Sequence, residues 1–236
     1  MIRILVVLTA LVAGCTPVVI QTGGGTPSST PASATAAPTS AEVQRKLDVF
    51  SGVVSRVEPV AESTCRSRDA RMPCDFRIIV DTSRNAPPNA YQTLEKGRPL
   101  LVFTLPLIVD ARNADELAFI MGHEAAHHIR GHIPQAQATA SAGAAIGAIL
   151  ATVAGAESSV VDTASQFGGF VGSRRFSKDF ELQADSLGAR IALKAGYDPV
   201  RGAEYFTRIP DPGNRFLGSH PPNAQRMQTV RDSVGR

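Results

Sequence analysis

The chain has 236 residues, of which 43% are hydrophobic, so it can bury one good-sized core and is expected to form one folded domain with appendages. Its formal net charge is only +3, and its Lys and Arg residues are spread out, without a dense basic stripe interleaved with aromatic residues. We therefore expect no nucleic-acid partner. Three cysteines are an odd number, so one of them needs a separate explanation.

The N-terminus has the features of a secretory leader. Arg3 precedes an apolar stretch, residues 4–13, that matches a signal-peptide core in length and is too short to span a bilayer. The stretch ends in Val12-Ala13-Gly14-Cys15, which resembles the lipobox of bacterial lipoproteins. That resemblance implies removal of residues 1–14, acylation of Cys15 and, because Thr16 rather than Asp follows, sorting to the outer membrane. An ordinary signal peptide with an incidental cysteine is the alternative interpretation.

Residues 15–41 are expected to form a flexible linker. From residue 22 onward they are Gly, Ser, Thr, Pro and Ala, which cannot bury enough apolar surface to offset the entropy of ordering the chain. Residues 42–236 would form the folded domain. Its first element is predicted to be an amphipathic helix that ends near Pro59. Its apolar residues recur at steps of four and three: Val43, Leu47, Phe50, Val54 and Val57.

Cys65 and Cys74 lie nine residues apart around a polar, Arg-rich connection. Outside the cytoplasm they would pair into a loop-closing disulfide. A metal-binding role for them has less support, because no histidine lies nearby in the sequence.

Three short apolar runs predict strands. Residues 76–81 alternate between apolar and other side chains, as a strand does. Residues 100–104 and 107–109 are separated by Pro106 and are expected to be edge-like strands, since Pro cannot donate to an interior ladder. Such an edge beside a cleft would either pack as an ordinary sheet or bind an extended peptide by strand addition.

A helix is predicted over about residues 113–131, and it contains the pattern HExxH from His123 to His127. Residues four apart lie one above the other on a helix, so these two imidazoles can chelate one metal ion. Glu124 lies on the next edge of that face, where it can take a proton from the attacking water as in zinc peptidases. His128 is expected to point away, and His132 to lie near the helix C-terminus, which favours a cation. Neither is expected to be a ligand.

Gly131 and Pro134 end or bend that helix, and residues 136–156 form a run rich in Ala and Gly without a charged residue. Its length approaches a membrane span, but small residues dominate, so a buried or close-packed helix is favoured over a transmembrane one. A third possibility is that this segment lies along the membrane to which Cys15 tethers the domain.

A further helix is predicted over residues 179–196, with Glu181 and Asp185 four apart on one face. Taken alone, this pair is an ordinary solvated acidic edge. Together with HExxH it changes meaning, because two-His, one-Glu zinc sites take their carboxylate from a second helix downstream. Asp185 is then expected to fix a ligand imidazole from behind.

These motifs resemble a known family when taken in order. His123-Glu124-x-x-His127 is followed by a stretch from Arg174 to Asp185 and by Ser219-His220-Pro221-Pro222 with Arg226. They are similar to the gluzincin metallopeptidases of peptidase family forty-eight, which includes HtpX and the CAAX prenyl protease, and more narrowly to its LoiP-like periplasmic lipoproteins. Asn89-Ala90-Tyr91 also resembles a short segment ahead of that family's active-site helix.

The resemblance implies an α+β fold, namely a mainly helical zincin-like domain with a small sheet. It implies one Zn²⁺ per chain, held by His123, His127 and Glu181, with Glu124 as general base and Asp185 behind the ligands. His220 and Arg226 would face the metal as candidate catalytic residues. His220 would either steady the oxyanion of the intermediate or bind the zinc itself and hold the enzyme latent. A turn histidine without such a role is the remaining interpretation.

The sequence therefore predicts a membrane-anchored zinc metalloendopeptidase of the bacterial cell envelope, on the periplasmic face of the outer membrane. The resemblance implies unfolded or misassembled envelope proteins as substrates and protein quality control as the role. The rival class is a lipoprotein interaction or chaperone-like module with a latent or structural zinc site. Its support is His220, which is a candidate fourth ligand.

Overall fold

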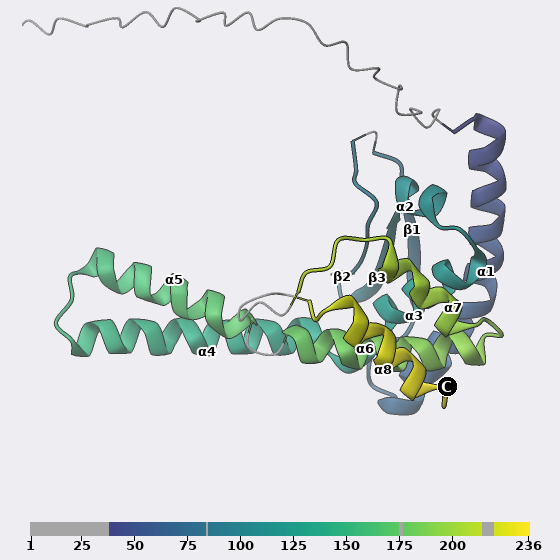
Figure 1. Ribbon diagram of the computed structural model, residues 1–236. Helices are drawn as coiled ribbons and strands as arrows, with labels where there is room; N and C mark the ends of the chain where they lie inside the picture. Colours follow the sequence, from purple (N-terminus) through teal and green to yellow (C-terminus); the bar gives the residue numbers. More distant parts are fainter. Residues whose placement is uncertain (1–37, 84, 175–176, 214–219) are drawn as a thin grey trace, which may run out of the picture. The chain divides into compact units, whose positions relative to one another are not determined.

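A computed structural model describes residues 38–236 except 84, 175–176 and 214–219, so the predicted leader, Cys15 and most of the predicted linker lie outside the described residues. The compact unit Pro38–Arg236 is mainly helical with one three-stranded sheet (Figure 1). This confirms the predicted α+β class. The elements are α1 (Ser40–Arg68), β1 (Arg77–Asp81), β2 (Ala90–Glu95), β3 (Arg98–Thr104), α2 (Leu105–Asp110), α3 (Ala114–Arg130), α4 (His132–Val153), α5 (Ser158–Arg174), α6 (Ser177–Lys194), α7 (Pro199–Ala203), η1 (Glu204–Thr207) and α8 (Asn223–Ser233).

Helix α1 runs further than its sequence predicts. The predicted end at Pro59 is wrong, because Pro59 lies inside the helix. Pro59 has no N–H for the carbonyl of Ser55, but both residues are exposed, so this carbonyl is open to solvent and the loss is small. The buried stripe continues beyond Pro59 through Ala61 and Cys65, and its packing favours a continuous helix.

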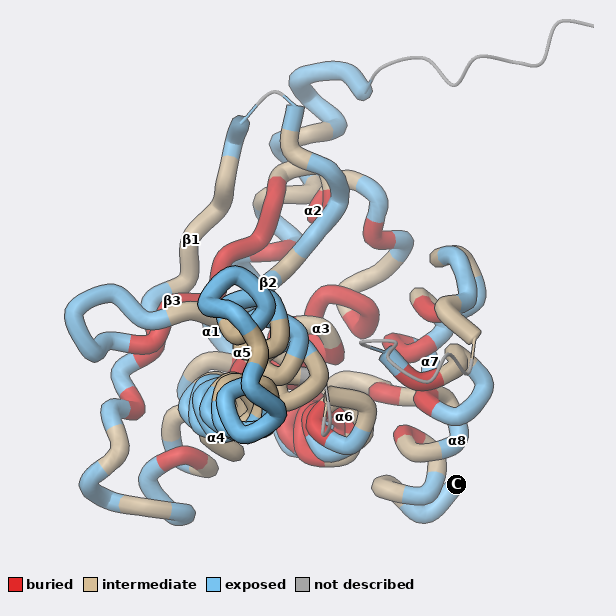
Figure 2. Tube along the Cα trace, turned by 90° about the vertical axis from the view of Figure 1, so that its left-hand side faces the viewer, coloured by how far each residue is buried: buried red, intermediate tan, exposed pale blue. Residues whose placement is uncertain are grey.

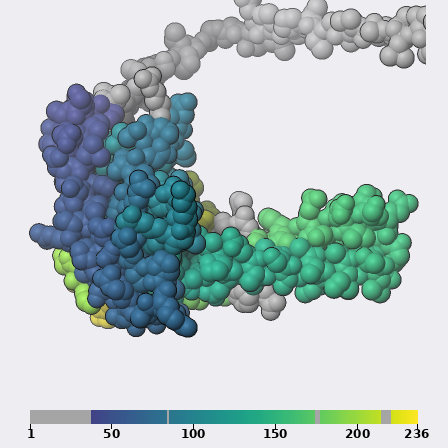
Figure 3. Space-filling model, turned by 180° about the vertical axis from the view of Figure 1, so that it is seen from behind, coloured from purple at the N-terminus to yellow at the C-terminus, as the bar shows by residue number. Residues whose placement is uncertain are grey.

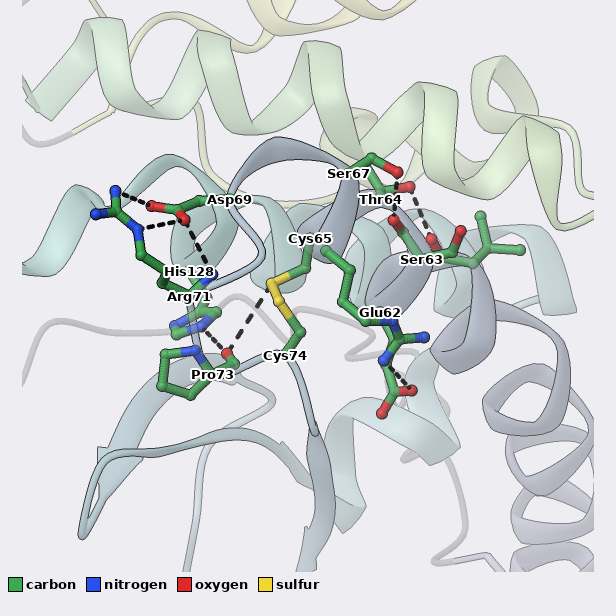
Figure 4. The surroundings of a disulfide bond; sticks show 12 residues. Glu62, Ser63, Thr64, Cys65, Ser67, Asp69, Arg71, Pro73, Cys74 and His128 are labelled. Atoms are coloured by element: carbon green, nitrogen blue, oxygen red, sulfur yellow. Dashed lines mark hydrogen bonds and ion pairs between the residues drawn. A yellow bond between two sulfur atoms is a disulfide. The ribbon is translucent and has the colours of Figure 1, made fainter.

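A disulfide between Cys65 and Cys74 ties the end of α1 to the segment that leads into β1 (Figure 4). Both cysteines are buried. The carbonyl of Pro73, next to the disulfide, accepts a hydrogen bond from Nε2 of His128 at 2.6 Å. His128 therefore links α3 to this turn instead of joining His123 and His127, as the sequence predicts.

The sheet has the order β1-β3-β2, with β1 parallel and β2 antiparallel to β3. The prediction of an edge strand at residues 100–104 is wrong, because β3 is the central strand and these residues are buried. The predicted strand at residues 107–109 belongs to α2 instead. Pro106 lies in the first turn of α2, where a missing N–H leaves no intrahelical bond unmade, and Thr104 caps that turn. β2 is an edge strand beside α3. This strand is not predicted from the sequence, and only its first two residues, Ala90 and Tyr91, belong to a motif noted above.

Helices α3 and α6 approach most closely at Gly122 and Gly188. A Cβ on Gly188 would lie 2.6 Å from the backbone nitrogen of His123, and a Cβ on Gly122 would lie 2.6 Å from the carbonyl oxygen of Gly188. Contacts this short are not possible for real side chains, so the backbones can touch only because both residues are Gly. The close approach brings the carboxylates of α6 beside the histidines of α3.

Helix α3 has the limits that its sequence predicts. Asn113 caps its start by accepting a hydrogen bond from the backbone N–H of Glu116 at 3.0 Å. Gly131 ends it in the left-handed conformation with φ of 69°, which is the usual role of Gly after a helix.

Helices α4 and α5 form an antiparallel hairpin that projects from the other elements of this unit (Figure 1). The predicted burial of residues 136–156 is wrong. By length and composition alone, α4 is the one described helix that could cross a membrane, yet none of its most apolar stretch is buried. The predicted close packing is found on one side of α4 only, where it meets α5. Helix α5 is not predicted from the sequence.

We predict that Gly188→Ala lowers the free energy of unfolding by about 1–3 kcal/mol, because its methyl group pushes α6 away from α3. Gly52→Ala is the matched control, since a Cβ at this helical position meets nothing within 4 Å. It is expected to raise stability by about 0.5–1 kcal/mol through helix propensity. Urea unfolding of the three proteins measures both changes, and equal stability of Gly188→Ala and the parent would contradict the close-contact argument.

Candidate metal centre

Three ligand-type side chains meet where α3 and α6 approach. The Nε2 atoms of His123 and His127 lie 3.0 Å apart. The carboxylate of Glu181 lies 3.6 Å from Nε2 of His123 and 3.5 Å from Nε2 of His127. Within the described residues, these three side chains form a group whose ligand atoms all lie within 4.8 Å of one another. The structure thus brings together the three ligands that the sequence proposes.

The donor atoms fit one metal ion. Tetrahedral bonds of about 2.0–2.1 Å separate neighbouring ligand atoms by roughly 3.4 Å, which is close to the spacings found here. Two imidazoles and one carboxylate also leave a fourth position open, which is the arrangement of catalytic rather than structural zinc sites.

A buried ion cluster supports the ligands from behind. Nδ1–H of His123 donates to Asp185 at 2.9 Å, which leaves Nε2 of His123 for a metal. From α8, Arg226 donates to both carboxylate oxygens of Asp185, at 2.8 and 2.7 Å, and its Nη2 lies 3.3 Å from Glu181. Burial by itself raises the pKa of Asp185, but the hydrogen bonds from His123 and Arg226 outweigh it and hold the pKa below its usual value. Asp185 therefore remains a carboxylate.

Arg226 is buried with the carboxylates, and its guanidinium lies 4.0 Å over the ring of Phe206. Arg226 is therefore held among buried partners, unlike a mobile side chain at the entrance of a cleft. Its contacts fix Asp185 and Glu181 of α6 in place, and Asp185 in turn bonds His123 of α3.

His132 is the functional contact that sequence reasoning misses. It is buried, its ring stacks on Phe180 with centroids 4.4 Å apart, and its Nδ1 lies 2.9 Å from Nδ1 of His127. Burial lowers the pKa of His132 to about 4, which favours the neutral ring. With Nε2 of His127 left for a metal, we assign the proton of this contact to Nδ1 of His127 and the acceptor role to Nδ1 of His132. The position near the end of α3 is the one that the sequence predicts, but burial rather than the helix end governs the charge of this ring. The available signal was Gly131, because a left-handed Gly turns the next residue back toward the preceding helix.

Glu124 lies beside the ligand group and lines a cleft of about 330 Å³. Burial raises the pKa of Glu124 to about 7, against the opposing effect of His123. A carboxyl group with a pKa near neutrality can both accept and return a proton. One wall of the cleft is formed by residues just before and at the start of β2. Beside the polar residues of the site, the lining includes these apolar side chains: Leu107, Phe119, Ile120, Phe206 and Ile209.

His220 lies at the exposed side of the cleft, ahead of α8. Its Nδ1 is 3.1 Å from Oε2 of Glu181, and half of its side chain is accessible to solvent. His220 therefore faces the group of His123, His127 and Glu181, where the sequence predicts it. This contact fits both of its predicted roles, as a fourth metal ligand and as a catalytic group.

An HExxH helix, a downstream Glu helix and a cleft between them define a metallopeptidase of the zincin class. The sequence model of peptidase family M48 matches residues 53–234, so the chain belongs to this family of metal-dependent peptidases. This confirms the family resemblance seen in the sequence.

The chain is also similar to a Vibrio cholerae serotype O1 protein that is provisionally named a beta-barrel assembly-enhancing protease, with 27% identity over 165 residues. The aligned segment is 66% of this chain and 32% of the relative, so the chain spans about a third of that protein's length.

We predict that His132→Phe weakens metal binding by about 10–100-fold, because Nδ1–H of His127 then has no acceptor while the stacking on Phe180 is kept. His128→Phe carries the same substitution in a histidine that bonds Pro73 instead, and it should leave the affinity unchanged. Competition titration of Zn²⁺ against a chromophoric chelator measures both. An unchanged affinity in His132→Phe would contradict the supporting role.

Proposed function

We propose that this protein is a zinc-dependent metalloendopeptidase of the bacterial envelope, anchored to a membrane through Cys15. The observation that carries the proposal is the group of His123, His127 and Glu181 in a cleft, with Glu124 at its edge. Membership of family M48 supports peptidase chemistry. Zinc is proposed from the donor set, since two imidazoles and one carboxylate are characteristic ligands of catalytic zinc.

In this proposal the residues of the chain position the reactants and move the proton. A bound zinc ion supplies Lewis acidity, which polarises the scissile carbonyl and lowers the pKa of water. Glu124 accepts the proton of the attacking water and then delivers it to the leaving amine, a task for which its pKa near 7 is suited. Asp185 and His132 each accept the Nδ1–H of one ligand imidazole, so both Nε2 atoms face the metal position.

The cleft suggests how a polypeptide would bind. Asn89 and Ala90 line it at the start of β2, an edge strand of the described sheet, so an extended peptide can add to this edge by backbone hydrogen bonds. The apolar walls suit hydrophobic side chains, which unfolded proteins expose. The name of the Vibrio cholerae relative concerns beta-barrel assembly and supports unfolded or misassembled envelope proteins as substrates.

The proposed location rests on two features of the chain. The lipobox-like segment that ends at Cys15 lies outside the described residues and supports a lipid anchor. The disulfide between Cys65 and Cys74 supports a compartment outside the cytoplasm, where disulfides persist. Together they favour a domain tethered at the membrane surface on the periplasmic side.

We predict that Glu124→Gln lowers the rate of cleavage of unfolded casein by at least about 10²-fold, because the amide cannot accept the proton of water. Zinc content should stay at one equivalent, since the ligand side chains are untouched. Glu42→Gln, at an exposed position in the first turn of α1, is the control and should keep full activity. Cleavage rates and metal content are measured on the same samples, and retained cleavage in Glu124→Gln would refute the assignment of the base.

A latent or structural zinc site in an interaction or chaperone-like module is the second candidate, and the contact between His220 and Glu181 favours it. A histidine this close to the ligand group is a candidate for the fourth position of a closed site.

We predict that His220→Ala changes the rate of casein cleavage, because His220 either blocks the fourth position or assists the reaction. An inactive parent with an active variant indicates latency, and an active parent with a slower variant indicates a catalytic role. Inactivity of both, with zinc bound, would favour the interaction module over the peptidase.

A further inference from the structure

The hairpin of α4 and α5 carries its large apolar side chains on the outside. Seven of them are exposed: Ile146, Ile149, Leu150, Val153, Val160, Phe167 and Phe170. Figure 2 looks along the hairpin, where exposed and intermediate colours predominate. The buried residue of α4 is His132, at the base of the hairpin. Figure 3 shows the hairpin standing clear of the other elements of this unit on the face in view. The side chains of Ile146, Leu150, Val153, Val160 and Phe167 are each more than half exposed.

The seam between the two helices is made of backbone and small residues. A Cβ on Gly143 or Gly147 of α4 would lie 2.1 Å from the carbonyl oxygen of Gly168 or Ala164 of α5, and Gly172 is equally tight against Thr139. A helix pair that is held together in water by the hydrophobic effect would bury its large apolar residues in this seam. Here they face outward while Gly and Ala face inward, which is the packing of helices that do not depend on water to associate.

Long stretches of the hairpin carry no charge, and three of its hydroxyls are satisfied within their own helices. Residues 133–156 and 163–173 contain no charged side chain. The hydroxyls of Thr152, Thr163 and Ser173 donate to carbonyls of their own helices, at 2.8, 2.9 and 2.7 Å. These hydroxyls therefore need no water to satisfy them.

The apolar side chains lie on one side of the hairpin. Successive helical residues turn by about 100°, so Ile146, Leu150 and Val153 share one flank of α4, displaced in one rotational sense from its glycine seam. Val160 and Phe167, seven apart, share a flank of α5 displaced from its seam in the same sense. Because the helices are antiparallel, these two flanks lie on the same side of the hairpin. We name these five residues the apolar flank.

The opposite side of the hairpin is polar or small. By the same rotation, Ser141 and Thr152 of α4 and Asp162 and Gln166 of α5 lie away from the apolar flank. All four are exposed. The hairpin is thus a two-helix layer with one apolar and one more polar side, which suits a boundary between hydrocarbon and water.

We propose that the apolar flank lies in the interface of a lipid bilayer, with the hairpin parallel to the membrane plane. This contact is separate from the proposed anchor at Cys15 and does not depend on peptidase activity. A transmembrane arrangement is disfavoured because it would place Asp162 and Gln166 in hydrocarbon. With α4 about 33 Å long at 1.5 Å per residue, the hairpin supplies a long contact that fixes how the domain faces the surface.

A bilayer fits this flank better than a second protein does. The flank consists of aliphatic side chains and one Phe, without the Tyr, Trp and Arg anchors that are enriched in the cores of protein interfaces. It also presents no hydrogen-bonding side chain that would set a register with a folded partner. The chain before Pro38, which includes the lipobox-like segment, provides the reason for a membrane to be nearby.

The test places an environment-sensitive fluorophore on each side of the full mature chain, at Leu150→Cys or Thr152→Cys, with uncharged phosphatidylcholine vesicles. The disulfide protects Cys65 and Cys74 from the label, and the parent chain labelled in parallel gives the background. We expect doxyl-labelled lipids to quench the Leu150 probe at least about threefold more than the Thr152 probe. Equal quenching of the two probes, or quenching of neither, would overturn the proposal.

Paired charge substitutions test the flank itself. Val153→Glu with Phe167→Glu changes the apolar flank, and Thr152→Glu with Gln166→Glu makes the same change in charge at the neighbouring positions on the other side. The first pair should abolish quenching of the Leu150 probe, and the second should preserve it. Circular dichroism and casein cleavage confirm folding in each case. If light scattering instead shows a dimer that the first pair dissociates, while no probe is quenched, the flank is a contact between copies and the proposal fails.

Discussion

The contact between the backbones of α3 and α6 at Gly122 and Gly188 is the constraint on which the metal centre depends. Because neither residue has a Cβ, the backbone of α6 lies directly against His123. Asp185 and Glu181, one and two turns earlier on α6, are then within reach of the two imidazoles. A wider helix separation would leave the histidines with no carboxylate at ligand distance, whatever the local quality of the HExxH helix.

The charges around this contact are stable only as a group. Asp185 is completely buried, and removing either His123 or Arg226 would leave its carboxylate partly unpaired in a low-dielectric interior. Arg226 also packs over Phe206, so α8 and η1 are joined to the ligand helices by the same side chain. The C-terminal segment of the chain thus supports a centre whose ligands lie on α3 and α6.

The projecting hairpin is inserted in the chain between the two helices that carry the ligands. Gly131 ends α3, and the first residue of α4 is His132, which contacts the ligand His127. The base of the hairpin and the support of the metal centre therefore share one turn. In the arrangement proposed above, the surface that meets the membrane is therefore joined directly to the helix that carries both ligand histidines.

The sequence by itself determined the features that depend on local spacing: the helix limits at Asn113 and Gly131, the ligand pattern on α3 and the i, i+4 carboxylates on α6. Tertiary structure decided the rest. Pro59 and Pro106 are compatible with helices because solvent or a first turn removes the cost of the missing N–H, which no sequence pattern states. The central position of β3, the exposure of α4 and the contact of His132 with His127 all depend on which elements lie side by side. A periodic pattern reports which face of a helix is apolar, but only the packed chain decides what, if anything, covers that face.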